Sequence, residues 1–385
     1  MKIPFDGEKL NALMEAAGAD LLLATSKDNV QYLLGGYRFF FFAHRDAIGV
    51  SRYLPLLGYP RGAPEKAFYI GNGMERWHQE VEPLWTPEIA NVQWSCDQAG
   101  REAAGFIRKR GLAKGRVAVE KSFLPADALD ALREELPGAQ FIEAGPILDA
   151  LRAVKRPEEL ALLKEASEDI IGSMMTVMTA TAPGTTTREI AHRMHHEEVG
   201  RGLDFEYCLT AAGPSFNRAP SEARWEKGRA LSLDSGGNKR GYIGDLARMA
   251  VMGPPTDLMK EVLGEIRAVQ AAARSVLRAG ALGREVYAAA LAEQEKCPHK
   301  GEMVFLAHGM GMIQHEAPHL TGSGIVPYPG TYENRALESG MVLSVETDMR
   351  NEEVGFVKLE DTIVVQDEGW EAYGDEGRDW VVAEG

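Results

Sequence analysis

The stretch LSLDSGGNKRGYIGDLARMA carries two aspartates, Asp234 and Asp245, on either side of a glycine-rich turn. Both lie among apolar and β-prone residues, where an unpaired carboxylate is costly to bury. If strand pairing is centred between Lys239 and Arg240, the two side chains face each other across a hairpin, with Cβ atoms about 4.5–5.5 Å apart. Because two anions repel at that separation, the pattern predicts a positive charge between them.

The same arrangement occurs near the C-terminus, where Glu346 and Glu360 flank the polar turn RNEEVG. Between the two acidic hairpins lies the glycine-punctuated stretch FLAHGMGMIQHEAPH, in which His308 and His315 are seven residues apart. Four carboxylates and an imidazole form a donor set of hard oxygens with one nitrogen, which suits Mn²⁺, Co²⁺, Fe²⁺ or Zn²⁺. Four carboxylates are enough to hold two such ions.

Composition excludes several other classes of protein. The chain has 385 residues, enough for two cores, and 45% of them are hydrophobic, but no apolar run approaches the roughly eighteen residues that cross a bilayer. A net charge of -15 argues against a nucleic-acid partner, since such binding depends on clustered Lys and Arg.

The N-terminus has no apolar signal segment, so a cytoplasmic location is expected. Three scattered cysteines, Cys96, Cys208 and Cys297, indicate buried thiols rather than a disulfide framework.

The order of apolar patterns predicts an α+β protein with two domains. Residues 1–152 alternate short apolar runs with helical segments, as an α/β domain does. Residues 153–385 begin with a long helix at Pro157, followed by a helix opened by Thr186 and Glu189 as a capping box. Strands, two more helices at 256–279 and 284–296 and a second set of strands complete a pseudo-repeat. The polar run HHEE within the second helix is expected to lie on a solvated face.

These motifs resemble the metallopeptidase group that includes methionine aminopeptidase, aminopeptidase P, prolidase and creatinase, whose catalytic domain has the pita-bread fold. The segment LLLATSKDNVQYLLGGY is similar to the creatinase/prolidase N-terminal domain, LRAVKRPEELALLKEA to the domain junction, and LEDTIVV to the end of the catalytic motif set. The resemblance therefore covers nearly the whole chain. It implies a creatinase-type α/β domain followed by a pseudo-repeated catalytic domain.

By this resemblance, the chain holds two divalent metal ions, with manganese expected and cobalt, zinc or iron as alternatives. Five residues correspond to the family's ligands: Asp234, Asp245, His308, Glu346 and Glu360. Asp245 and Glu360 would bridge the ions, Asp234 would bind one of them, and the remaining two ligands would bind the other. His315 matches a catalytic histidine that contacts the substrate or the tetrahedral intermediate.

Two positions depart from the family pattern, and both bear on catalysis. Asn217 lies seventeen residues before the first aspartate, where prolidase and aminopeptidase P relatives carry a histidine; an amide cannot shuttle protons near neutral pH. Lys358, on the same strand face as Glu360, replaces a usual arginine and offers a point charge in place of a bidentate fork. Both changes put an ordinary Xaa-Pro specificity in doubt.

A segment of the first domain, YRFFFFAHRD, is a second candidate for substrate contact. In creatinase-like dimers the matching segment reaches into the partner's active site, which implies a homodimer here. Four consecutive phenylalanines cannot all face one side of a strand, so some should lie at an interface or pocket, the alternative being a buried strand. The expected substrate-binding residues are Phe39, Phe41, His44, Arg45 and His319.

Three functions remain open from the sequence. The first is a metal-dependent hydrolase of small peptides, most simply a dipeptidase or Xaa-Pro peptidase. The second is a non-peptide C–N hydrolase of the creatinase or ectoine hydrolase type, which Asn217 and Lys358 favour. The third is a metal-binding module without catalysis, like the family members that bind histones or RNA, against which the complete ligand set and the compact length count. The expected ligand is a small molecule or short peptide, with no nucleic acid and no membrane.

Overall fold

The computed structural model of the chain describes residues 2–42 and 44–384, except for the side chains of Arg45 and Asp46. The chain divides into two compact units, Met1–Leu151 and Arg152–Gly385. The boundary lies one residue from the division expected at residue 152. Within the described ranges, no helix combines the length and apolar character that a bilayer span requires.

The N-terminal unit is built on a six-stranded mixed sheet in the order β4-β3-β2-β1-β5-β6. The strands are β1 (Leu21–Ala24), β2 (Leu56–Pro60), β3 (Phe68–Asn72), β4 (Glu88–Gln93), β5 (Arg116–Val119) and β6 (Gln140–Glu143). The helices are α1 (Gly7–Ala17), α2 (Lys27–Leu33), α3 (Arg45–Ile48), α4 (Glu75–Val81), α5 (Cys96–Lys109), α6 (Ala126–Glu135) and α7 (Gly145–Arg152). Helices α5 and α6 place small side chains such as Ala103 and Ala128 against the apolar residues of the central strands.

The C-terminal unit has an eight-stranded sheet whose main path is β12-β13-β14-β11-β10-β8, with β15 beside β14 and β16 beside β11. The strands are β7 (Thr185–Thr186), β8 (Asp204–Ala212), β9 (Arg224–Trp225), β10 (Ala230–Lys239), β11 (Tyr242–Met252), β12 (Met303–Gly309), β13 (Val342–Asn351), β14 (Gly355–Val365), β15 (Trp370–Tyr373) and β16 (Val381–Ala383). The helices are α8 (Pro157–Ala180), α9 (Thr187–Gly200), α10 (Asp257–Ser275) and α11 (Gly283–Gln294). Two helices followed by strands thus occur twice, as the sequence pattern predicts.

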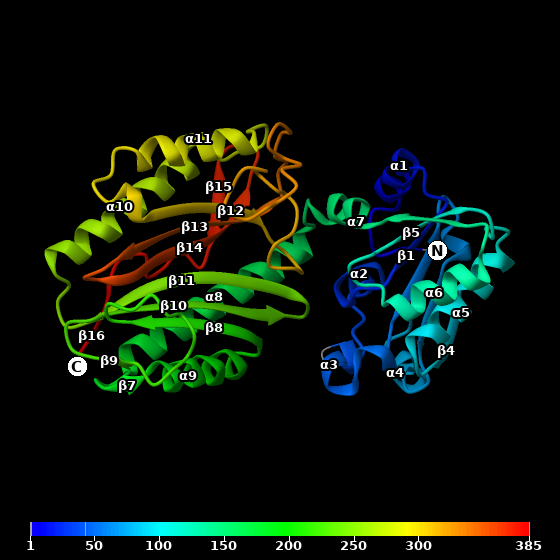
Figure 1. Cartoon of the computed structure of the whole chain (residues 1–385), viewed down its shortest axis with the longest axis horizontal. Helices are drawn as coiled ribbons and strands as arrows, with labels where there is room; N and C mark the ends of the chain where they lie inside the picture. The colour runs from blue at the N-terminus through cyan, green and yellow to red at the C-terminus, as the bar shows by residue number, and fades with distance from the viewer. Residues whose placement is uncertain (1, 43, 385) are drawn as a thin grey trace. The chain divides into compact units, whose positions relative to one another are not determined.

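Two separate apolar cores hold the helices on this sheet. Figure 1 shows the helix pairs α8–α9 and α10–α11 beside different parts of the sheet. Helices α8 and α9 pack on β8, β10 and β11, and helices α10 and α11 pack on β12 to β14. On β14 the odd-numbered residues Val357 and Leu359 lie in the α10–α11 core, so the even-numbered residues point to the other face. The predicted ligand residue Glu360 therefore points to that other face.

Helix starts follow the predicted local signals. Helix α8 begins at Pro157, which needs no hydrogen-bond partner for a backbone N–H in the first turn. Thr186 caps α9: its hydroxyl accepts from the Glu189 backbone N–H at 3.2 Å, and the Glu189 carboxylate accepts from the Thr186 backbone N–H at 2.9 Å. These reciprocal bonds form the capping box predicted from the sequence.

The first acidic hairpin has a different register from the one predicted. Asp234 pairs with Ala247, and Asp245 pairs with Gly236, so the two aspartates are diagonal neighbours on one face and do not stand directly opposite. The prediction failed because SGGNK continues β10 and is not part of the turn. The turn is the two-residue loop Arg240–Gly241, in which both residues have positive φ (51° and 98°), as a type I′ hairpin requires.

A buried arginine joins the two halves of the sheet. Strands β11 and β14 share the single register pair Ala247↔Glu360. The Arg248 Nη1 atom donates to the carbonyl oxygens of both residues at 2.8 Å, and Nη2 lies 2.9 Å from the Asp361 carboxylate. Arg248 is fully buried, so these contacts replace its hydration and compensate for the short backbone pairing.

The HHEE run differs from expectation at one residue. His195 and His196 are exposed, but Glu198 is buried between α9 and β10. One Glu198 oxygen accepts from the Ser235 hydroxyl at 2.6 Å, and the other has no hydrogen-bond partner among the described residues. Burial raises the pKa of Glu198 to about 8, so the side chain is protonated at neutral pH.

The raised pKa of Glu198 makes the free energy of unfolding depend on pH. Because the folded state keeps a proton that the unfolded chain loses above about pH 4.3, stability falls as pH rises from there toward 8. Glu198→Gln should reduce that fall by on the order of 2–4 kcal/mol at pH 8, at about 1.4 kcal/mol per pKa unit. Urea unfolding at pH 5 and pH 8 gives the free energy of unfolding at each pH, and the difference between the two is the quantity compared. Glu197→Gln, one residue away, is the control, and an equal pH dependence in both variants would contradict the assignment.

Candidate metal centre

Five predicted ligand residues lie on five neighbouring strands of the C-terminal sheet. From one edge of the set to the other, the strands β12, β13, β14, β11 and β10 contribute one side chain each. In that order the residues are His308, Glu346, Glu360, Asp245 and Asp234. Glu346 and Glu360 are direct register partners, as the sequence predicted for the second hairpin. All five are buried.

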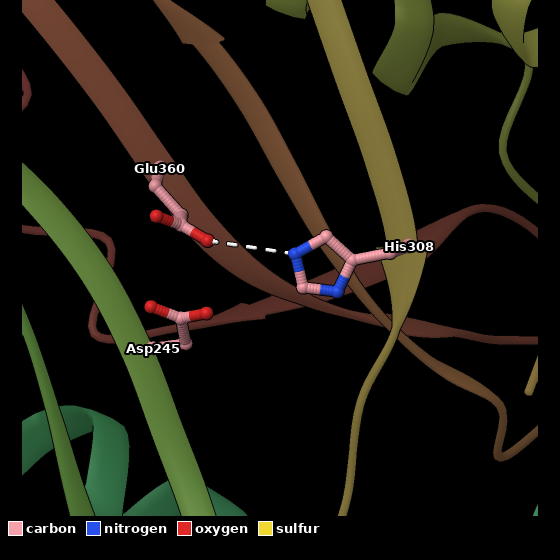
Figure 2. Close-up of side chains that lie close together, drawn as sticks. All are labelled: Asp245, His308 and Glu360. Atoms are coloured by element: carbon pink, nitrogen blue, oxygen red, sulfur yellow. Dashed lines mark ion pairs between the residues drawn. The ribbon is translucent and has the colours of Figure 1, made fainter. Parts of the chain in front are cut away.

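Three of these side chains form a compact group that could hold a metal ion. Asp245, His308 and Glu360 each offer a ligand atom within 4.8 Å of the others. Figure 2 shows the carboxylates of Asp245 and Glu360 turned toward each other, with the imidazole Nε2 directed at Glu360 at 3.8 Å. The Nε2 atom is buried and has no hydrogen-bond partner among the described residues. An unpartnered ring nitrogen facing carboxylate oxygens fits a divalent cation.

Lys358 provides positive charge at the other side of the cluster. Its ammonium lies 2.7 Å from Asp234, 2.5 Å from Glu346 and 2.7 Å from Glu360. The guanidinium of Arg218 also donates to Asp234 and stacks on the Phe356 ring at 4.7 Å. The positive charge was predicted between Asp234 and Asp245; the chain supplies positive charge at Asp234, shared with the two glutamates of the second hairpin.

Asp245 is oriented by two side chains that the sequence analysis did not single out. Tyr207 donates its hydroxyl to one carboxylate oxygen, and the Gln314 amide donates to the other at 2.7 Å. The Gln314 amide also donates to the hydroxyl oxygen of Tyr207 at 2.8 Å. Gly236 makes room for this arrangement, because a Cβ there would overlap the Tyr207 ring. Both carboxylate oxygens of Asp245 are thus fixed in direction.

The carboxylates of this cluster have shifted pKa values in opposite directions. Burial, with the charges of Asp245 and Glu346, raises the pKa of Glu360 well above its usual range. Burial also acts to raise the pKa of Glu346, but the charges of Lys358 and His308 outweigh it and lower that pKa. Neighbouring carboxylates that cannot all ionise freely indicate a site with too little positive charge.

His315 lies beside the cluster in a neutral form. Its ring stacks on the His308 ring at 3.9 Å between centroids, and its Nδ1 atom is hydrogen-bonded to the Tyr328 hydroxyl. Burial and the nearby His308 lower the pKa of His315 to about 4. Burial raises the pKa of Tyr328, so its hydroxyl keeps its proton and can donate a hydrogen bond to Nδ1. In that tautomer the His315 proton is on Nε2, which is then a hydrogen-bond donor.

A buried ion-pair cluster anchors the loop that carries His315. The adjacent Glu316 carboxylate lies 3.0 Å from both Arg152 Nη1 and Lys155 Nζ, and it accepts from the Ile313 backbone N–H at 3.1 Å. Burial alone would raise the pKa of Glu316, but the two cations lower it overall. The loop is thereby fixed to the beginning of the C-terminal unit, 160 residues earlier in the chain.

Asn217 and His319 make no hydrogen bond or ion pair with the five ligand residues in the part of the chain that the structure describes. Asn217 is exposed and donates to Ala219 O at 3.1 Å in its own loop. His319 is buried, and its ring lies 5.4 Å from the Tyr328 ring. Whether these two residues contact substrate stays a prediction.

The phenylalanine segment forms the short 3₁₀ helix η1 (Phe40–Phe42), not a strand. Phe39 and Phe41 are buried and pack against Tyr53, with ring centroids 6.1 and 5.5 Å away, whereas the Phe40 ring is half exposed. His44 is exposed, and the Arg45 side chain lies outside the described residues. Substrate contact by Phe39, Phe41, His44 and Arg45 stays a prediction, and Phe40 is the ring most accessible to a partner.

Three residues at the cluster were missed although each had a weak signal in the sequence. Arg218 follows Asn217 directly, Gln314 precedes His315, and Tyr207 lies on the strand predicted before the first hairpin. Each is polar in a segment already connected with the site. Their side-chain directions depend on loop conformation and register, which residue type alone does not define.

A second group of possible ligands lies elsewhere in the same unit. Glu261 and Glu265 on α10 and His299 offer ligand atoms within 4.8 Å of one another. Here His299 Nδ1 lies 2.7 Å from the Glu265 carboxylate, which also accepts the His299 backbone N–H at 3.1 Å. These contacts already satisfy the pair, so this group serves as a reference for the main cluster.

Comparison with known families matches both units. The model for metallopeptidase family M24 matches residues 161–367, and the model for the creatinase/prolidase N-terminal domain matches residues 8–154. A curated relative named Xaa-Pro dipeptidase, from Lactobacillus helveticus, is 26% identical over 303 residues, covering 74% of this chain and 80% of the relative. The family resemblance inferred from the motifs is confirmed.

Solved structures share the fold over the whole chain. A structure described as Xaa-Pro dipeptidase from Bacillus anthracis has a TM-score of 0.80 at 22% identity, covering 98% of both chains. The N-terminal domain of FACT complex subunit SPT16 from Cicer arietinum has a TM-score of 0.73 at 14% identity, covering 100% of both chains. The predicted fold class, an α/β N-terminal domain followed by a pita-bread domain, is confirmed.

Removal of a central ligand should abolish metal binding. Asp245→Ala and Glu360→Ala each delete a carboxylate of the compact group, and the expected loss of affinity exceeds about tenfold, since even outer partners of metal ligands are worth 10–100-fold. Elemental analysis after dialysis against Mn²⁺ measures the bound metal. Glu261→Ala, in the reference group, should retain it. Metal content equal to that of the unmodified protein in Asp245→Ala would show that the ligands are wrongly assigned.

Loss of the Glu316 charge should destabilise the C-terminal unit. Glu316→Gln leaves Arg152 and Lys155 buried without their carboxylate, and breaking a buried pair in this way costs about 3–5 kcal/mol. Urea unfolding followed by fluorescence gives the free energy of unfolding. Glu338→Gln, at an exposed pair with Arg335, is the matched control and should change stability by less than about 1 kcal/mol. Equal effects of the two substitutions would refute the anchoring role.

Proposed function

Because the chain belongs to metallopeptidase family M24, we propose that it is a metal-dependent dipeptidase that hydrolyses short peptides of the Xaa-Pro type. The observation that carries the proposal is the complete set of five ligand residues on adjacent strands. Among the described residues, the buried Nε2 of His308 has no hydrogen-bond partner, and it faces carboxylates. The relatives named Xaa-Pro dipeptidase support the substrate class. The donor set of carboxylates and one imidazole supports a divalent ion, for which manganese is our proposal.

We assign the ligand roles as the family resemblance implies, with two ions at saturation. Asp245 and Glu360 would bridge them, Asp234 would bind one, and His308 with Glu346 the other. Bound divalent ions lower the pKa of water and polarise a carbonyl oxygen, which is the chemistry that amide hydrolysis needs.

The chain's own residues supply orientation and hydrogen bonds. Tyr207 and Gln314 fix the direction of the Asp245 oxygens. His315, neutral and with its proton on Nε2, can donate a hydrogen bond to a substrate carbonyl or to the oxyanion that forms from it. The Glu316 anchor holds that donor in place. In this role His315 acts as an electrophilic donor rather than as a base.

We also propose a homodimer in the cytoplasm. Large apolar side chains of the N-terminal unit are exposed, including Trp77 at 65% and Trp94 at 53%, and such exposure is typical of contact surfaces. The three cysteines are buried free thiols, as expected in a reducing compartment. Light scattering of the purified chain measures the mass, and a 42.1 kDa particle would contradict the dimer.

The deciding experiment combines metal content with substrate choice. We expect hydrolysis of Ala-Pro and Gly-Pro with added Mn²⁺, loss of that hydrolysis after chelation and its return on adding the ion, because the ligands hold the ion reversibly. Ala-Ala is the matched control substrate, and Asp245→Ala is the inactive control protein.

The other outcomes distinguish the alternatives. Bound metal with cleavage of N-acyl amino acids or cyclic amidines, but not of Xaa-Pro dipeptides, would identify a non-peptide C–N hydrolase. This second candidate is favoured by Asn217, which is exposed and donates its hydrogen bond within its own loop, to Ala219 O. Tight metal binding without hydrolysis of any of these substrates would identify a binding module and refute the enzyme assignment.

A further inference from the structure

Lys358 occupies the centre of the carboxylate cluster as a metal ion would. It is buried, with 6% of its surface exposed, and an ammonium group has three N–H donors. Its nitrogen lies within 2.7 Å of three different carboxylates, from Asp234, Glu346 and Glu360. The ammonium donates a hydrogen bond to Asp234 Oδ2 and forms ion pairs with the two glutamates, so its three anionic neighbours all belong to the cluster.

The two glutamates divide their oxygens between two cation positions. The Oε1 atoms of Glu346 and Glu360 lie 3.6 and 3.8 Å from His308 Nε2. The Oε2 atoms of the same residues lie 2.5 and 2.7 Å from the Lys358 nitrogen. An ion at the His308 end can therefore bind Oε1 atoms, together with Asp245, while Lys358 keeps its contacts with the Oε2 atoms.

The Asp234 end offers no such freedom. The Oδ2 atom of Asp234 accepts from Lys358 at 2.7 Å and also from Arg218. Glu360 Oε2, which would be shared with an ion at this end, is the second atom that Lys358 contacts. A divalent ion here would lie beside an ammonium in a buried site, where repulsion between cations is only weakly screened.

We infer that Lys358 takes the place of a cation at the Asp234 end, so that the chain binds one divalent ion readily and a second only by displacing Lys358. The first ion binds at the His308 end. The inference rests on the proposed metal site but not on peptidase activity. It makes Lys358 a positioning residue that sets the order in which the ions bind.

Metal titration of the full chain tests this order. Metal-stripped protein is titrated with Mn²⁺ by calorimetry, and elemental analysis at each plateau gives the ions per chain. We expect one ion to bind first and the second to bind at least about tenfold more weakly, a difference of roughly 1.4 kcal/mol. In Lys358→Met the second affinity should rise by about tenfold or more, while Asp234→Asn should lose the second ion and keep the first.

Arg350→Met is the matched control for loss of one positive charge. Arg350 lies on β13, its Nε atom is 4.0 Å from Asp348, and it should leave both affinities unchanged because it contacts no ligand among the described residues. If the affinity for the second ion rose equally in Arg350→Met, loss of any nearby positive charge would explain the effect, and the inference would be overturned.

Other results separate failure of this inference from failure of the metal site. Two ions of equal affinity in the unmodified protein, or an unchanged second affinity in Lys358→Met, would overturn the inference alone. No bound ion in any variant would overturn the site as well. If Lys358→Met does not fold, Arg218→Met tests the same competition at Asp234 Oδ2: a strengthened second ion supports the inference, and an unchanged one overturns it.

Discussion

Buried negative charge is the constraint on which the C-terminal unit depends. Four carboxylates share one face of a single sheet, and an ionised carboxylate without compensation costs several kcal/mol to bury. Charge compensation therefore has to come from the chain or from bound ions. The side chains that supply it are Lys358 and Arg218 as cations, and Tyr207, Gln314 and Ser344 as hydrogen-bond donors. The balance remains negative, which is the condition under which divalent ions stabilise a fold.

A second charged layer behind the sheet keeps the first in register. Asp361, next to Glu360 but on the opposite face, lies 2.9 Å from Arg248 and 2.5 Å from Arg274. Arg248 also donates to the carbonyl oxygens of Ala247 and Glu360. It therefore stabilises the short pairing of β11 with β14, where the two halves of the sheet meet. The separation between Glu360 and Asp245, one from each half, therefore depends on a buried ion pair as well as on backbone pairing.

Spacing along the chain was enough to predict which residues gather, because alternation in strands fixes the face of each side chain. Residues an even number of positions apart in strand register share a face, so Asp234 and Asp245 lie on one face as predicted, although the register is shifted by two residues. The shift arose from Arg240, whose positive φ has no signature in residue type. Local rules also located the helix caps, since a capping box involves only near neighbours.

Contacts between distant segments could not be predicted in the same way. Glu316 binds Arg152 and Lys155 across about 160 residues, and nothing in either motif specifies the other. The loop after β8 directs Arg218 to Asp234 and turns Asn217 away, although the two residues are adjacent. Glu198 lies in a polar run but is buried, because tertiary packing decides which turn of α9 faces the sheet. Each result depends on three-dimensional context that residue type does not carry.

The stability cost of the cluster is itself an argument about function. Replacing buried ionic groups by apolar residues of similar size is often neutral or stabilising by about 1–4 kcal/mol, so a scaffold that only had to fold would gain from losing them. Here the set is complete, and the buried His308 Nε2 atom at its edge has no hydrogen-bond partner within the described ranges of the chain. In the proposed site, Lys358 reduces the cost at one end of the cluster, and a bound divalent cation would reduce it at the other end, at His308. On this proposal, the cation that compensates the buried negative charge is also the one that acts on the substrate.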